Sequence, residues 1–126
     1  YYCSADVFCA PATGAESFGV VLLEALASGL PVVATEVPGY MSVLEPGRDS
    51  VTVQPKNWRE LAASLVILAR DPELRARMSD YALRKARRYS WDRIASEIVD
   101  VYHDARRVFI AGPASALEVS GVHHAV

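Results

Sequence analysis

The chain contains the stretch Gly14-Ala15-Glu16-Ser17-Phe18-Gly19-Val20-Val21-Leu22-Leu23-Glu24-Ala25, which is typical of a tight loop followed by an apolar helix. One carboxylate, Glu16, precedes the expected helix, and a second, Glu24, lies about two turns into it. Burying a lone carboxylate costs several kcal/mol, so a charge on such a helix indicates a partner or a ligand. A nucleotide sugar requires this arrangement: one acid for its sugar hydroxyls, free helix N–H groups for its phosphates and a second acid for its ribose.

Glu24 carries the stronger signal of the two acids. It lies six residues after Phe18, or ~9 Å along a helix axis, which is about the distance from a diphosphate to the ribose of the same nucleotide. A carboxylate accepts hydrogen bonds from two vicinal hydroxyls, as a ribose presents them. The alternative is a surface glutamate that reaches water or pairs with an arginine. None of its helical neighbours, Val20 and Ser28 included, is charged, and this favours the ligand.

Glu16 and Gly19 each have two interpretations. An acid before a helix stabilises the helix dipole, and Glu16 taken alone fits this role better than the binding of sugar hydroxyls. Gly19 leaves the first helical turn without a side chain, so that a phosphate or sugar oxygen can approach the backbone. An ordinary loop glycine that eases packing explains it equally well.

Three short apolar runs in the first half of the chain are expected to be strands. Residues 7–10 and 31–35 have the character of buried parallel strands, and residues 50–53 that of an edge strand. Helical segments separate them, which predicts an α/β protein with a Rossmann-like parallel sheet flanked by helices. Three strands are few for a sheet, and the chain opens on Tyr1 without a capping residue, so we expect a domain truncated at its N-terminus.

The helices between the strands are expected over residues 18–28 and 40–44. Ser17 is the candidate N-cap of the first, and Gly29 follows it at the C′ position. Both helices connect consecutive strands, as a parallel sheet requires.

The second half of the chain has the helical period of 3.6 residues. One helix starts near Trp58, a second follows an Asp71 cap with Pro72 in its first turn, and a third follows Ser90. Residues 1–109 are therefore expected to form one domain, and residues 110–126 an irregular tail to which we assign no structure or function.

Composition limits the possible partners. The 126 residues carry a net charge of -2 and 52% hydrophobic residues, which gives no general reason to expect nucleic-acid binding. No apolar run approaches the ~20 residues of a membrane span. Cys3 and Cys9 are interpreted as reduced thiols packed in apolar surroundings, as in a cytoplasmic protein.

The sequence offers no metal site. His103, His123 and His124 are expected to be exposed, and there is no Asp-x-Asp pair for a divalent ion. The basic run over residues 83–88 is interpreted as a solvated helix end, where cations oppose the helix dipole, although anionic lipid or phosphate is an alternative ligand for it.

The motif segments together resemble the retaining glycosyltransferases of family 4. The central likeness is Glu16-Ser17-Phe18-Gly19 followed by Glu24, with seven residues between the two acids. Three flanking segments agree: Ala5-Asp6-Val7-Phe8-Cys9-Ala10-Pro11, Ala25-Leu26-Ala27-Ser28-Gly29-Leu30-Pro31-Val32-Val33-Ala34-Thr35 and Tyr89-Ser90-Trp91-Asp92. The resemblance covers residues 1 to about 107. Within the family, the phosphatidylinositol mannosyltransferase branch is the most similar, because of Cys9-Ala10-Pro11 and residues 13–19.

The resemblance implies a GT-B architecture, of which this chain is the later part of the C-terminal, donor-binding domain. Glu16, at the catalytic position, is expected to hold hydroxyls of the transferred sugar, and Glu24 to bind the ribose. The substrate-binding positions between them are Ser17, Phe18, Gly19 and Val20, where the backbone from Phe18 onward meets the sugar and the diphosphate. The donor is a nucleotide-diphosphate sugar, and the site uses neither a metal nor a further cofactor.

The same resemblance implies the transfer of a hexose, mannose or glucose, to a lipid or saccharide acceptor. The expected partners are an N-terminal Rossmann-like domain and, in the full protein, the inner face of the cytoplasmic membrane. The Arg and Lys that clamp the diphosphate in the family are absent, so the chain alone is expected to be inactive. Two alternatives are a non-catalytic nucleotide-binding module and a structural remnant whose edge strand pairs with another chain.

Overall fold

The computed structural model describes residues 1–111, and the side chains of residues 1–109. It divides the chain into two units, Tyr1–Tyr89 and Ser90–Val126. The sheet, both candidate acids and the loop between them belong to the first unit. Most of the expected tail, residues 112–126, lies outside the described residues.

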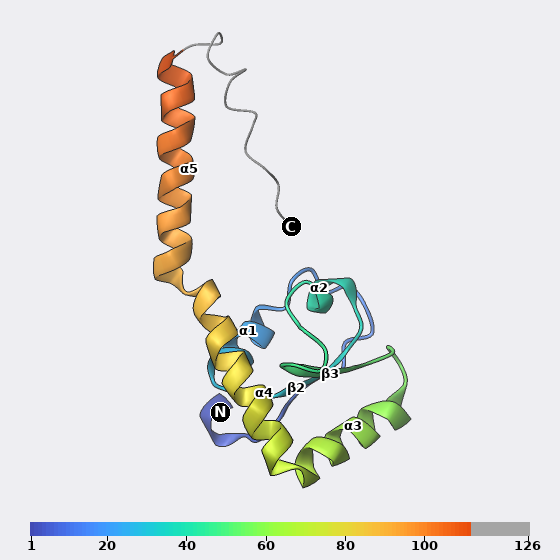
Figure 1. Ribbon diagram of the computed structural model, residues 1–126. Helices are drawn as coiled ribbons and strands as arrows, with labels where there is room; N and C mark the ends of the chain where they lie inside the picture. The colour runs from blue at the N-terminus through green and yellow to red at the C-terminus, as the bar shows by residue number, and fades with distance from the viewer. Residues whose placement is uncertain (112–126) are drawn as a thin grey trace. The chain divides into compact units, whose positions relative to one another are not determined.

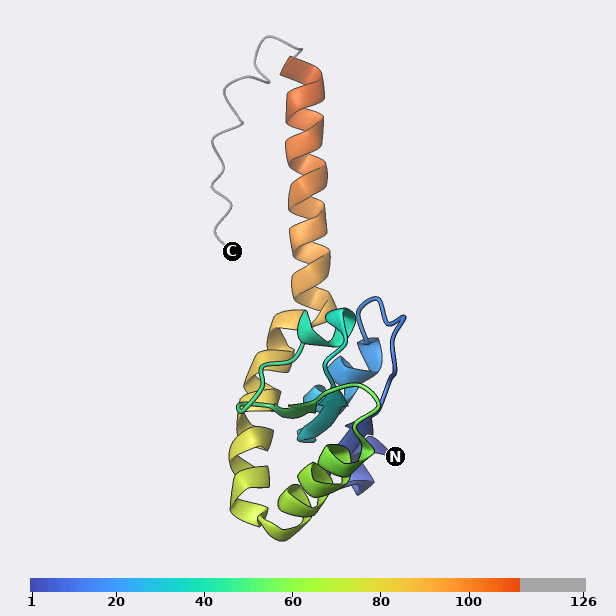
Figure 2. The ribbon, with the colours of Figure 1, turned by 90° about the vertical axis from the view of Figure 1, so that its right-hand side faces the viewer.

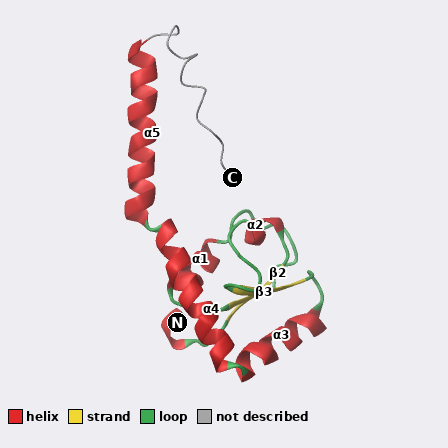
Figure 3. Ribbon diagram, viewed as in Figure 1, coloured by secondary structure: helices red, strands yellow, loops and turns green. Residues whose placement is uncertain are grey.

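The sheet contains three parallel strands, β1 (Phe8–Ala10), β2 (Val32–Thr35) and β3 (Ser50–Val53), in the order β1-β2-β3 (Figures 1 and 3). The register pairs Phe8 with Val32 and Val32 with Ser50. All four residues of β2 are buried, as expected of a central strand that is covered on both faces. The predicted α/β class and all three strand positions are confirmed.

Helices cover both faces of this sheet (Figure 2). One core packs α1 (Val20–Ala27), the short α2 (Pro38–Met41) and the end of α4 (Pro72–Ala86) against β2. A smaller core on the other face contains Val33 of β2, with Leu68 of α3 (Trp58–Arg70) and Met78 of α4. The alternating side chains of β2 therefore serve both cores, which places the ends of the strands between two helical layers.

Two helix starts differ from the sequence expectation. Helix α1 begins at Val20 rather than at residue 18, and its N-cap is Gly19, with a left-handed φ of 79°, instead of Ser17. Residues that carry a side chain rarely adopt this backbone conformation, so the glycine determines where the helix starts. Helix α2 begins at Pro38 rather than at residue 40, because proline suits the first turn of a helix.

Other helix ends agree with the expectation. Gly29 follows α1 with a φ of 74°, the left-handed conformation typical of a C′ residue. The Asp71 carboxylate accepts a hydrogen bond of 2.8 Å from the Leu74 N–H and caps α4, next to Pro72. Helix α5 (Trp91–Ala111) begins directly after Ser90 and continues two residues past the end expected at 109.

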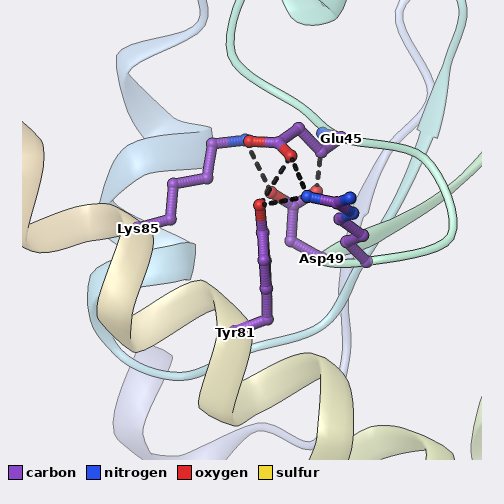
Figure 4. Close-up of polar contacts among 5 residues, drawn as sticks. Glu45, Asp49, Tyr81 and Lys85 are labelled. Carbon is purple, nitrogen blue, oxygen red and sulfur yellow. Dashed lines mark hydrogen bonds and ion pairs between the residues drawn. The ribbon is translucent and has the colours of Figure 1, made fainter.

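The basic run at the end of α4 is not uniformly solvated, because Lys85 is buried. Its ammonium pairs with the fully buried Asp49 carboxylate at 2.7 Å and with Glu45 at 3.2 Å (Figure 4). The Tyr81 hydroxyl donates to Glu45 at 2.6 Å. This contact is the main reason that the pKa of Glu45 lies below its ordinary value, against the opposing effect of partial burial. We call Glu45, Asp49, Tyr81 and Lys85 the buried ion cluster; it ties α4 to the turn before β3.

Candidate functional site

The loop that carries the candidate site starts at the carboxyl end of β1. Thr35, buried at the end of β2, donates its hydroxyl to the Ala12 carbonyl at 2.5 Å and lies 3.5 Å from that of Ala10. The first residues of the loop are thereby attached to the carboxyl edge of the sheet. Ligands of open α/β sheets bind beyond this edge.

The backbone of the loop is strained in its middle. Ala15 has a φ of 62°, a left-handed conformation that costs a residue with a side chain about 1–2 kcal/mol. Strain of this kind persists where the surrounding structure holds it, and it is frequent at binding sites. Helix α2 packs against this part of the loop, because a Cβ added to Gly39 would lie 2.3 Å from the Glu16 carbonyl oxygen. The loop and α2 are thus in direct backbone contact.

Gly19 is also required by packing. A Cβ at this position would lie 2.8 Å from the Tyr40 ring, closer than carbon atoms approach. The structure therefore favours the packing interpretation of Gly19, together with its left-handed φ. Whether a ligand also approaches the backbone here is a separate question, because the contact with Tyr40 does not close the start of α1.

Glu16 is exposed, and its neighbour is a buried tyrosine. The pKa of Tyr40 is raised by burial first, and then by the negative charge of Glu16 and a hydrogen bond to that carboxylate. Tyr40 is only 4% exposed, so its ring is held in place close to the Glu16 carboxylate. Nothing in the local sequence pattern links residue 40 to residue 16, so this neighbour of Glu16 is visible only in the folded chain.

Glu24 is exposed as well, and it forms no ion pair within the described residues. Its Oε2 accepts a hydrogen bond of 2.9 Å from the Tyr2 hydroxyl. Nothing in the local sequence around Glu24 points to Tyr2 as its hydrogen-bond partner, because the two residues are 22 positions apart. The carboxylate is oriented, uncompensated by a cation and open to solvent.

The residues between the two acids form an exposed, partly apolar surface. Phe18, Val20 and Val21 are 40%, 60% and 44% exposed, and Ser17 is exposed without capping the helix. The N–H groups of the first turn of α1 follow Gly19 directly. Backbone donors and exposed apolar side chains therefore lie between two carboxylates, a combination suited to a phosphorylated ligand with hydroxyls at both ends.

The site is an open surface rather than an enclosed pocket. A small cavity of about 170 Å³ lies at the same edge of the sheet, but neither acid lines it; its walls are Pro11, Thr13, Thr35, Lys56, Asn57, Trp58 and Leu61. A cavity of about 150 Å³ holds a single benzene-sized ring. This one is therefore too small for a nucleotide.

Both cysteines are exposed free thiols, so the expected apolar packing is wrong. Cys9 occupies the position of β1 whose side chain points away from the core, between the half-buried Phe8 and the buried Ala10. Within residues 1–111, no cluster of three or more potential metal ligands is present. In the same part of the chain, no helix combines the length and the apolar character needed to cross a membrane.

The contact between Tyr2 and Glu24 has a measurable signature. The pKa of Tyr2 is raised, chiefly because its hydroxyl donates to Glu24. The contact therefore exists below the ordinary tyrosine pKa and is lost as the pH rises through the raised value. We expect Glu24→Gln to lower the pKa of Tyr2, measured by NMR titration of the ring, and Glu16→Gln to leave it unchanged. An unchanged Tyr2 titration in Glu24→Gln would contradict the contact.

Residues 1–85 match the family described as Glycosyl transferases group 1. The chain belongs to this family. A phosphatidyl-myo-inositol mannosyltransferase of Mycobacterium leprae is 44% identical over 99 residues, which is 79% of this chain and 26% of the relative. A D-inositol 3-phosphate glycosyltransferase of Corynebacterium urealyticum is 37% identical over 90% of this chain and 26% of its own length.

Solved structures extend the likeness to the fold. Sucrose-phosphate synthase from Thermosynechococcus elongatus superposes with a TM-score of 0.78 at 28% identity, over 89% of this chain and 27% of the synthase. Anabaena HepE in complex with UDP-glucose gives 0.76 at 27% identity, over 82% and 29%. The neighbours are GT-B glycosyltransferases, so the predicted fold class is confirmed. The chain spans about a quarter to a third of the length of these relatives and solved structures.

Proposed function

We propose that this chain is the donor-binding part of a retaining glycosyltransferase that transfers a hexose from a nucleotide-diphosphate sugar to a lipid or saccharide acceptor. The observation that carries the proposal is the pair of exposed acids, Glu16 and Glu24, which flank the N-terminal turn of α1. Glu24 accepts a hydrogen bond from the Tyr2 hydroxyl, and Glu16 lies close to the buried Tyr40. HepE, which shares this fold, has been solved with UDP-glucose. A nucleotide sugar is therefore the ligand class that fits best.

In this proposal each part of the loop and helix start binds one part of the donor. Glu16 accepts hydrogen bonds from hydroxyls of the transferred sugar, close to the reacting carbon. The backbone at Phe18, Gly19 and Val20, with Ser17 beside it, meets the sugar and the diphosphate. Helix N–H groups stabilise the charge that grows on the departing diphosphate, which is the main electrostatic task of the reaction.

Glu24 binds the ribose at the other end of the donor. Its carboxylate faces solvent with no cation beside it in residues 1–109, so a diol replaces water there without breaking an ion pair. The relatives named for inositol-containing substrates favour an acceptor of the inositol or inositol-lipid class. A lipid acceptor would bring the full protein to the inner face of the membrane, with an N-terminal Rossmann-like domain supplying the acceptor site.

The test is calorimetric or NMR titration of the chain with GDP, UDP and ADP. We expect Glu24→Gln to weaken nucleotide binding by about 1–3 kcal/mol, because charge-assisted hydrogen bonds to the ribose are lost. Glu73→Gln, an exposed glutamate in the first turn of α4, is the matched control and should bind as the unsubstituted chain does. If the unsubstituted chain, Glu24→Gln and Glu73→Gln bind with equal affinity, Glu24 does not contact the nucleotide. If none of the nucleotides binds, a structural role for the chain is favoured.

A further inference from the structure

Tyr2 is a part of the site that the proposed roles of the loop and helix leave unused. It lies in the 3-10 turn Tyr2–Ser4, whose backbone is closed by hydrogen bonds from Ser4 to Tyr1 and from Ala5 to Tyr2. Its ring packs against Phe8 of β1 at 5.6 Å between centroids, and both rings border the larger core. The hydroxyl is thus carried by a fixed ring, while its acceptor, Glu24, stands on the exposed face of α1.

This geometry limits what the Glu24 carboxylate can do. An exposed glutamate side chain has three rotatable bonds and otherwise samples many orientations. The hydrogen bond to Oε2 selects one of them. A carboxylate has about four lone-pair directions, of which Tyr2 occupies one on Oε2; about three remain, one on Oε2 and two on Oε1. Both oxygens can therefore still accept hydrogen bonds from a pair of vicinal hydroxyls.

We propose that Tyr2 is a positioning residue that orients Glu24 for a ribose diol and so helps the site to discriminate ribonucleotides from deoxyribonucleotides. The inference rests on the proposed donor site. Tyr2 does not touch the ligand in this account; it holds the carboxylate in the orientation that a ribose needs, so that less conformational freedom is lost on binding. The raised pKa of Tyr2 has this hydrogen bond to Glu24 as its main cause.

A purely structural role for Tyr2 makes a different prediction. If the hydroxyl only attaches the N-terminal turn to α1, its removal would affect every nucleotide equally, whatever its sugar. If the hydroxyl orients Glu24, its removal affects only ligands that carry the diol. The readout that separates the two is the ratio of affinities for a ribonucleotide and its 2′,3′-dideoxy analogue.

The experiment compares the 126-residue chain with Tyr2→Phe, Glu24→Gln and the double variant. Each is titrated by NMR with GDP and 2′,3′-dideoxy-GDP, and with the corresponding uridine pair. We expect the unsubstituted chain to prefer the ribonucleotide, and Tyr2→Phe to reduce that preference by about threefold to tenfold while the dideoxy affinity stays the same. The double variant should show no loss of preference beyond that of Glu24→Gln alone. Tyr1→Phe is the matched control, since Tyr1 is fully exposed, and it should keep the full preference.

The outcomes separate this inference from the function on which it rests. Glu24→Gln with an unchanged ribose preference would overturn the ribose role itself. If Glu24→Gln reduces the preference for ribonucleotides but Tyr2→Phe keeps it in full, only the role of Tyr2 would be overturned. Equal losses for ribonucleotide and dideoxynucleotide in Tyr2→Phe would assign the residue to folding. No binding by the unsubstituted chain at about 10 mM nucleotide would overturn both the donor site and this inference.

Discussion

Replacing Asp49 by alanine is expected to lower the free energy of unfolding by about 3 kcal/mol. Asp49 is fully buried, and its carboxylate pairs with the Lys85 ammonium at 2.7 Å while it also accepts the Glu45 N–H at 2.8 Å. Removing one partner of a buried pair costs about 3–5 kcal/mol, because the other charge remains in a poorly solvated place. Glu45, at 3.2 Å from the same ammonium, keeps the loss at the lower end of that range. Urea unfolding followed by circular dichroism measures it.

The matched control is Asp80→Ala, one helical turn before Arg84 on α4. Asp80 and Arg84 form an ion pair whose side chains are 65% and 62% exposed. Such pairs contribute about 0.3–0.5 kcal/mol, so the control should change stability little. Equal effects of the two substitutions would show that the buried ion cluster does not stabilise the fold.

Replacing Gly39 by alanine is expected to destabilise the protein by about 2 kcal/mol, although alanine normally favours a helix over glycine by about 1 kcal/mol. The reason is steric, because the added Cβ would lie 2.3 Å from the carbonyl oxygen of Glu16 and 2.7 Å from its carbonyl carbon. Either the loop or α2 must move, which displaces Glu16 from Tyr40. Thermal unfolding measures the stability, and the NMR shifts of the Tyr40 ring report the displacement.

Gly47→Ala is the control for this steric effect. A Cβ at Gly47 meets nothing within 4 Å, but the residue has a φ of 79°, so the substitution costs about 1 kcal/mol through backbone strain alone. It should leave the Tyr40 ring signals unchanged. Stabilisation by Gly39→Ala, the result that helix propensity alone predicts, would rule out the close contact between the loop and α2.

The strands were predictable because burial on both faces leaves a direct trace in the sequence. β2 appears as an uninterrupted apolar run and is buried throughout. The start of α1 was not predictable in the same way. Ser17 has the side chain of an N-cap, but a left-handed φ at Gly19 delays the helix to Val20. The close packing of Gly19 against Tyr40, 21 residues later in the chain, is not visible in the local pattern.

The candidate site was predictable only in its local part. The spacing of Glu16 and Glu24 is visible in one short stretch, whereas their tyrosine partners lie 24 residues after the first and 22 before the second. Lys85 was misjudged for a related reason. Its basic neighbours suggested a solvated helix end, while its acceptor, 36 residues earlier, depends on how the turn before β3 meets α4. Contacts between distant segments are set by tertiary packing, which local patterns do not encode.

The hydroxyl of Tyr2 also bears on where this domain can be cut. Because the residue stands six positions before β1, a recombinant version that starts at the first strand would retain all three strands and both acids. It would nonetheless lack the group that orients the second acid. Measurements on such a shortened protein would then underestimate nucleotide affinity, although its sheet and helices would look intact by spectroscopy.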